Sequence, residues 1–139
     1  MTKARDTNLS AEYFVLSVLH RLGLSATLTV GKNRFVDIVV TQPKGELVTI
    51  DVNVLAGKIS WPVDNGKPNY PNHFYAFVCF HGKLEDPAVL PEIFVVPANR
   101  LNRLVTLDPT GHRMIRLKEV RSKGGEYRNA WRLLRRHSG

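Results

Sequence analysis

The stretch RFVDIVVTQPKGELVTIDVNVL, residues 34–55, contains two apolar runs joined by a turn of hairpin length. The runs 34–40 and 46–55 are rich in Val and Ile, which favour strands, and the TQPKG cluster between them favours a turn. A third run, 26–30, precedes them after the short turn-forming cluster GKN. The stretch therefore predicts a three-stranded meander.

Polar residues interrupt both runs. Asp37 stands inside FVDIVV, where Asp has a low strand propensity, so it indicates a bulge, a strand end or a functional site. In the next run successive side chains point to opposite faces, so Asp51 and Asn53 share one face of an otherwise apolar strand. Either that face is solvated, as on many antiparallel sheets, or it is a site.

The remaining elements flank this meander. Apolar residues at helical spacing predict a helix over 8–23, and a Pro- and Gly-rich segment predicts a loop over 57–72. Two further buried strands, a short helix and a C-terminal helix are predicted over 73–80, 92–96, 97–105 and 126–136. This order predicts one α/β domain, residues 1–139, with a mixed sheet flanked by helices.

Composition fits an ordinary globular chain, with 139 residues, 43% hydrophobic and 23% charged. No apolar run has membrane-spanning length and the first residues lack the apolar core of a secretion signal, so we expect a soluble, cytoplasmic protein. The single cysteine, Cys79, lies within an apolar run and is expected to be a small buried residue.

The positive charge is concentrated at the C-terminus. The net charge is +8, and residues 112–139 hold nine Lys or Arg against two Glu. Such a basic segment indicates an anionic partner such as nucleic acid, although a solubilising face has the same composition.

Glu12 is a third unusual carboxylate. On a helical wheel it lies within about 40° of Leu16 and about 20° of Leu19, inside the apolar arc of the first helix. It either sits in the first helical turn and reaches water, or it enters a polar site. Glu12, Asp37 and Asp51 can converge, and at about 5 Å each ionised pair repels by roughly 3 kcal/mol, which favours a divalent cation among them.

This arrangement of residues resembles the PD-(D/E)XK, or restriction-endonuclease-like, nuclease superfamily, and within it the archaeal-type Holliday-junction resolvases. The resemblance covers about residues 8–105 and more loosely the predicted C-terminal helix. It implies an αβββαβ core that hydrolyses DNA phosphodiester bonds with Mg²⁺ or Mn²⁺. Asp37 and Asp51 would be the metal ligands and Glu12 an auxiliary carboxylate. Many proteins of this scaffold act as homodimers, although no segment here marks an interface.

One residue departs from the family pattern, because Asn53 stands where the motif has lysine. Either Asn53 or Lys58 takes the place of that lysine, or the chain binds nucleic acid without cutting it. A third alternative is a basic protein that stays soluble through its charge or docks on an acidic protein. The residues expected to contact nucleic acid are Lys58, Trp61, Lys67, Arg113, Arg116 and Arg132. The five histidines show no ligand spacing and no role is expected of them.

Overall fold

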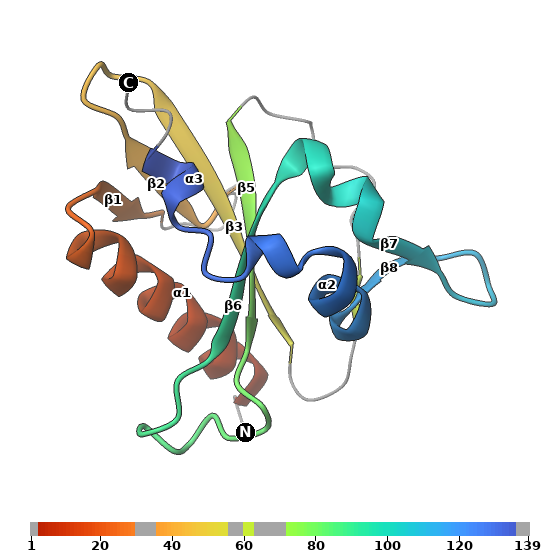
Figure 1. Cartoon of the computed structure of the whole chain (residues 1–139). Helices are drawn as coiled ribbons and strands as arrows, with labels where there is room; N and C mark the ends of the chain where they lie inside the picture. Colours follow the sequence, from red (N-terminus) through yellow and green to blue (C-terminus); the bar gives the residue numbers. More distant parts are fainter. Residues whose placement is uncertain (1–2, 30–35, 56–59, 63–71, 136–139) are drawn as a thin grey trace.

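The computed structural model describes residues 3–29, 36–55, 60–62 and 72–135. Its elements, in chain order, are α1 (Lys3–Arg21), β1 (Ser25–Leu28), β2 (Ile38–Thr41), β3 (Leu47–Leu55), β4 (Ser60–Pro62), β5 (His73–Cys79), β6 (Glu92–Pro97), the 3-10 helix η1 (Ala98–Leu104), β7 (Val105–Leu107), β8 (Arg113–Arg116), α2 (Leu117–Lys123), the 3-10 helix η2 (Gly125–Tyr127) and α3 (Arg132–Arg135) (Figure 1).

The central sheet has five strands in the order β1-β2-β3-β5-β6. The strands β1, β2 and β3 form an antiparallel meander, as the sequence predicts, whereas β5 joins β3 in parallel and β6 closes the sheet antiparallel to β5. In Figure 1 α1 lies on one side of the central strands, and η1, α2 and the β7–β8 hairpin lie on the other. The predicted mixed α/β fold with flanking helices is therefore confirmed.

A second sheet, with the order β4-β8-β7, was not predicted. Its strands are only three or four residues long, too short to show a clear hydrophobic period. The loop predicted over 57–72 is wrong at residues 60–62, which pair with β8. The helix predicted over Pro97–Val105 is of the 3-10 type.

The C-terminal helix predicted over 126–136 is wrong for most of its length, since η2 and α3 hold only short parts of it. Asn129 has a φ of 49°, a left-handed conformation that a right-handed helix cannot contain. Instead, Arg128 pairs with Phe94 on the outer edge of β6, and the Asn129 amide donates to the Ile93 carbonyl at 2.9 Å. The basic segment thus covers the edge of the central sheet, which would otherwise present unpaired backbone groups.

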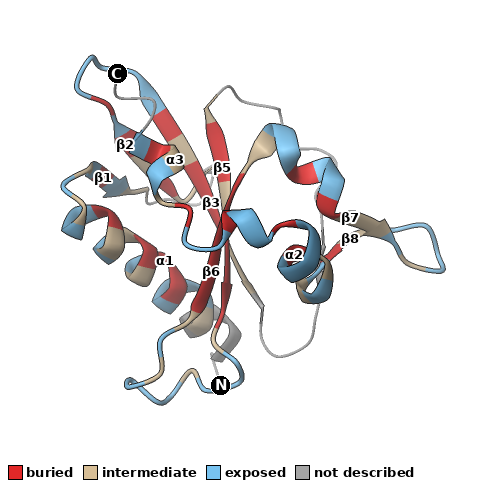
Figure 2. Ribbon diagram, in the orientation of Figure 1, coloured by how far each residue is buried: buried red, intermediate tan, exposed pale blue. Residues whose placement is uncertain are grey.

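The core lies between α1 and the central strands and continues beneath η1 and α2 (Figure 2). Ala11, Val15 and Leu19 line the buried side of α1, which packs against β1 and β3. Cys79 is buried, as predicted. Among the described residues, no helix combines the length and the apolarity needed to cross a bilayer.

Candidate functional site

The candidate site lies where the β2–β3 ladder ends. The last strand pair is Ile38 with Ile50, and one further bond follows, from the Asp37 amide to the Ile50 carbonyl at 3.0 Å. The next amide of β3 in this direction, that of Val52, donates at 2.7 Å to Oδ2 of the Asp37 side chain. Asp37 is thus a strand-end residue whose carboxylate lies against the β3 backbone beside Asp51.

The backbone of Asp37 is also held from β1. The Thr29 amide donates to the Asp37 carbonyl at 2.9 Å, and the Thr29 hydroxyl donates to the same carbonyl at 3.3 Å and to that of Val36. Asp37 is therefore held by Thr29, which follows β1, and by Ile50 and Val52 of β3, and it directly precedes β2. This is the kind of rigid support that a functional site needs.

Asp51 is buried, with 3% of its surface exposed, so the interpretation of its face as solvated is wrong. Its Oδ2 lies 3.5 Å from Nε2 of His73, the first residue of β5. The other ring nitrogen of His73 is 2.7 Å from the Thr49 hydroxyl. Thr49 and His73 are direct partners in the parallel β3–β5 pair, so the sheet itself sets the orientation of the imidazole against Asp51.

His73 is the residue of this site that sequence patterns miss. Its one signal is a polar side chain at the start of the apolar run 73–80. That signal has no meaning without the register of β5 against β3, and no local pattern specifies a parallel pairing across a long connection. The imidazole is further packed edge-on against Tyr75, with ring centroids 5.0 Å apart.

Asn53 lies on the same face of β3 as Asp51, as the strand period predicts, and it is half-buried. Its partner across the parallel pair is Phe77, whose ring stacks with Tyr75 at a centroid distance of 6.1 Å. On this face of β3 Asn53 is thus the next residue after Asp51, with an aromatic residue as its partner on β5.

Glu12 is buried, with only 4% of its surface exposed, on the helix that packs against β1 and β3. Because α1 begins at Lys3, Glu12 lies in the interior of the helix and not in its first turn. The interpretation that it sits in that turn and reaches water is therefore wrong. A carboxylate with so little access to water needs compensating donors or a cation.

The expected nucleic-acid contacts are distributed over the second sheet and the C-terminus. Lys58 and Lys67 lie outside the described residues, and the main chain of Trp61 belongs to β4, where it pairs with Ile115. Arg116 on β8 and Arg132 on α3 are exposed. Arg113 is half-buried and donates from Nη2 to Oδ1 of Asn102 at 2.7 Å.

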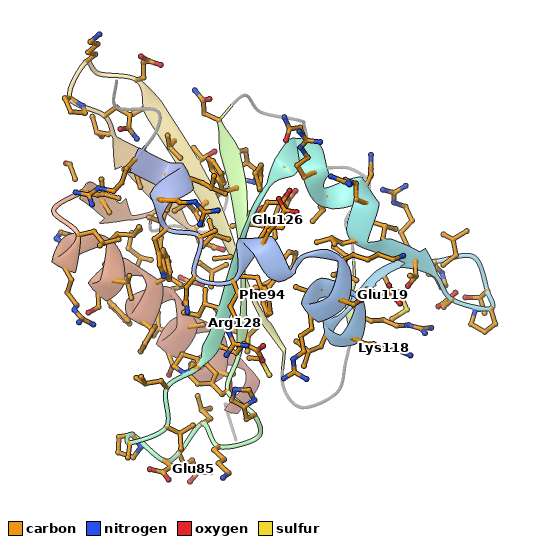
Figure 3. The ribbon with its side chains drawn as sticks, in the orientation of Figure 1. Glu85, Phe94, Lys118, Glu119, Glu126 and Arg128 are labelled. Carbon is orange, nitrogen blue, oxygen red and sulfur yellow. The ribbon has the colours of Figure 1, made fainter. Side chains whose placement is uncertain are left out.

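Other basic residues of the C-terminal segment stabilise the fold. Arg121 on α2 and Arg128 both pair with Glu92 at the start of β6, at 2.7 and 3.3 Å. Figure 3 shows Arg128 beside β6 and Lys118 on α2, pointing away from the central sheet. The basic segment is therefore partly structural and partly an exposed cationic surface.

Comparison with known proteins gives a likeness in fold and none in sequence family. No protein-family model matches the chain, and no curated protein matches it. Among solved structures, a bacterial homing endonuclease, I-Ssp6803I, matches with a TM-score of 0.57 and 18% sequence identity, over 99% of this chain and 94% of that one. A likeness at this identity reports architecture, so the chain shares the α/β fold of a nuclease.

Proposed function

We propose that this chain is a metal-dependent endonuclease of the PD-(D/E)XK type that hydrolyses DNA phosphodiester bonds. The observation that carries the proposal is the hydrogen bond from the Val52 amide to Asp37. It brings the Asp37 carboxylate next to the backbone of Asp51, a second and buried carboxylate, at the end of the β2–β3 ladder. The fold shared with a homing endonuclease supports the same conclusion.

The residues at this point fit a hard divalent cation. Asp37 and Asp51 offer carboxylate oxygens, the ligands that Mg²⁺ and Mn²⁺ prefer. A carboxylate has about four lone-pair positions, so a bond to Val52 or to His73 is compatible with metal ligation. The bound cation would polarise a phosphoryl oxygen and lower the pKa of a water molecule.

The surrounding side chains would hold the reactants in position. His73, supported by Thr49, orients Asp51, and the Val52 amide orients Asp37. Glu12, buried on the helix that packs against β1 and β3, would act as an auxiliary carboxylate. Asn53 would donate from its amide to a phosphate oxygen or a water in the place of the motif lysine, with Lys58 as the alternative source of positive charge.

A second candidate function is DNA binding without cleavage, and Asn53 is the observation that favours it. An amide brings no positive charge, and the loss of one preorganised electrostatic contact reduces a rate by about 10²–10³. In either case exposed cations such as Arg116 and Arg132 would contact the phosphate backbone.

The test is incubation with plasmid, flap and four-way-junction DNA in Mg²⁺ or Mn²⁺, with and without a chelator. The Asp51→Asn variant removes the charge of one proposed metal ligand. Asp86→Asn is the matched control, because Asp86 is an exposed loop residue that accepts a hydrogen bond from the Ala88 amide at 3.0 Å. We expect chelator-sensitive cutting that is lost in Asp51→Asn and kept in Asp86→Asn. Salt-dependent DNA binding with no cutting would select the second candidate function. If the chain neither binds nor cuts DNA, both candidate functions are wrong.

A further inference from the structure

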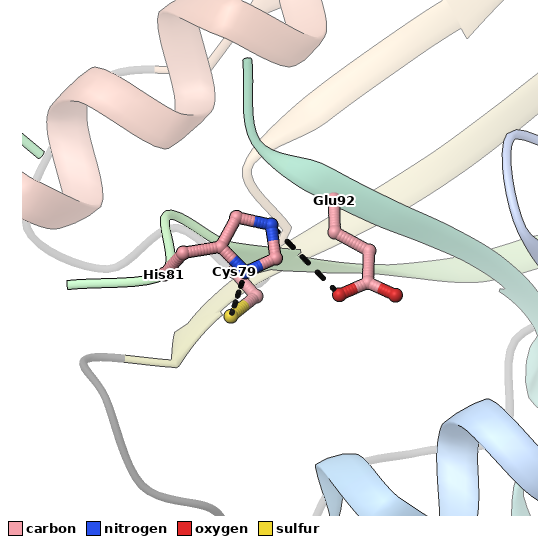
Figure 4. A group of neighbouring side chains, drawn as sticks. All are labelled: Cys79, His81 and Glu92. Carbon is pink, nitrogen blue, oxygen red and sulfur yellow. Dashed lines mark hydrogen bonds and ion pairs between the residues drawn. The ribbon is translucent and has the colours of Figure 1, made fainter. Parts of the chain in front are cut away.

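A group of three potential metal ligands lies at the C-terminal end of the parallel strands β3 and β5, away from the carboxylates Asp37 and Asp51. Cys79 is the last residue of β5, Glu92 is the first of β6, and the two are direct partners in the antiparallel ladder. His81 follows Cys79 in the turn. Its Nδ1 is 4.0 Å from Cys79 Sγ, and its Nε2 is 4.0 Å from Glu92 Oε1 (Figure 4).

The turn after β5 explains how His81 returns over the strand end. His81 has a φ of 58° and Gly82 a φ of 70°, two consecutive left-handed residues that reverse the chain at once. Such a conformation is uncommon for a residue other than glycine. The reversal places an imidazole that is 40% exposed above a thiol and a carboxylate that are buried.

We propose that Cys79, His81 and Glu92 bind a zinc ion at a site separate from the carboxylates of the proposed nuclease centre. One ligand atom from each residue lies within 4.8 Å of the other two. In an equilateral triangle with sides of 4.8 Å, the upper limit here, the centre is about 2.8 Å from each corner, compared with a Zn–S distance of about 2.3 Å and a Zn–N distance of about 2.0 Å. Shifts of at most about 0.8 Å for each ligand atom would complete the three bonds and leave a fourth position for water.

The chemistry of the ligands selects the ion. A thiolate and an imidazole favour Zn²⁺ and disfavour Mg²⁺, which prefers oxygen. Binding converts the Cys79 thiol to a thiolate, so one proton is released to solvent as the Zn–S bond forms. The site would therefore discriminate between zinc and the cation expected at Asp37 and Asp51.

Glu92 is already oriented for this role. Arg121 donates to both of its oxygens, from Nη2 at 2.7 Å and from Nε at 3.1 Å, so the carboxylate is held in a fixed position. Carboxylates that bind metals are commonly supported in this way. The side chain of Arg128 is 60% exposed and makes the longer contact with Glu92, at 3.3 Å, so this guanidinium group can move toward water when a cation arrives while Arg121 keeps Glu92 in position.

The proposed zinc site is independent of the nuclease proposal. Cys79 pairs with Leu55, four residues along β3 from Asp51, which at about 3.3 Å per residue is roughly 13 Å away. The zinc ion would join the end of β5, the start of β6 and, through Glu92, the helix α2. Its presence can be measured without DNA.

The experiment is zinc titration of the full chain by calorimetry, together with Co²⁺ substitution followed by absorption. We expect one Zn²⁺ per chain, no competition from Mg²⁺, and a thiolate-to-cobalt charge-transfer band. Cys79→Ala should remove the band and weaken zinc binding at least about 100-fold, more than the loss of a supporting contact around a metal. His81→Asn, which tolerates the left-handed turn, should also weaken binding, and His112→Asn, at an exposed histidine in another turn, should not.

Thermal unfolding checks that each variant is folded before its affinity is compared. If Cys79→Ala does not fold, the cobalt spectrum of the unmodified chain and the affinity of His81→Asn decide the question. Absence of stoichiometric zinc binding, a cobalt spectrum without the thiolate band, or unchanged affinity in His81→Asn would each overturn the proposal. None of these results bears on DNA cleavage.

Discussion

Replacing Asp37 in two ways separates its structural contribution from its part in the proposed metal site. Asp37→Ala removes the acceptor of the Val52 amide, a bond of 2.7 Å at the end of the ladder. An amide left without its partner in a largely buried place costs about 1–3 kcal/mol. For a domain of this size that corresponds to a fall in Tm of about 3–12 °C.

Asp37→Asn keeps an oxygen at the same place and removes only the charge. The side-chain carbonyl still accepts from the Val52 amide, so the unfolding free energy should stay within about 0.5 kcal/mol of that of the unmodified chain, or rise as repulsion from Asp51 is removed. Affinity for Mg²⁺ and any cleavage should be lost, because the ligand charge is gone.

The assay combines urea unfolding, Mg²⁺ titration by calorimetry and plasmid cleavage for both variants, with Asp86→Asn as control. Two results would show that Asp37 does not have these two roles. One is an Asp37→Asn chain that binds Mg²⁺ and cuts DNA as well as the unmodified chain does. The other is an Asp37→Ala chain that is as stable as Asp37→Asn, which would mean that the bond to Val52 does not hold the strand ends together.

Three further measurements test Asn53, the exposed arginines and Asp108. Asn53→Lys should raise cleavage by about 10²–10³ by restoring a preorganised charge, and an unchanged rate would show that Asn53 does not occupy the lysine's place. Combined Arg116→Gln and Arg132→Gln should lower the slope of log affinity against log salt by about 2 in DNA binding, whereas Lys83→Gln in an exposed turn should leave it unchanged. Hydrogen bonds from the Thr110 hydroxyl and the His112 amide lower the pKa of Asp108 from 3.8 to about 2. Because the folded pKa is lowered, this stabilisation of the β7–β8 turn is complete above pH 3.8 and is lost as the pH falls through about 2. NMR titration of Asp108 near 3.8 would contradict it.

The sequence predicts the meander well because its signals are local. Val- and Ile-rich runs around TQPKG specify β2 and β3, and the strand period places Asp51 and Asn53 on one face. Asp37 lies directly before β2, and a strand end is one of the three alternatives that the low strand propensity of Asp indicates. For Glu12 the helical wheel leaves two alternatives open, and the structure shows the buried one.

The parts that could not be predicted depend on long-range pairing. The contact of His73 with Asp51 follows from a parallel register between β3 and β5, and the Cys79–Glu92 pair from the register of β5 and β6. The short strands β4, β7 and β8 are stabilised by one another and carry little pattern of their own. The apolar residues 130–134 suggest a helix that begins near residue 126, but the left-handed conformation of Asn129 interrupts it.

The most direct test of the proposed nuclease centre is a crystal soaked in Mn²⁺ and examined by anomalous scattering. The proposed centre predicts a peak bound by carboxylate oxygens of both Asp37 and Asp51, at a distance of about 2.1 Å, the value typical of a small octahedral cation. A crystal that binds Mn²⁺ elsewhere, with no peak between these two side chains, would contradict it.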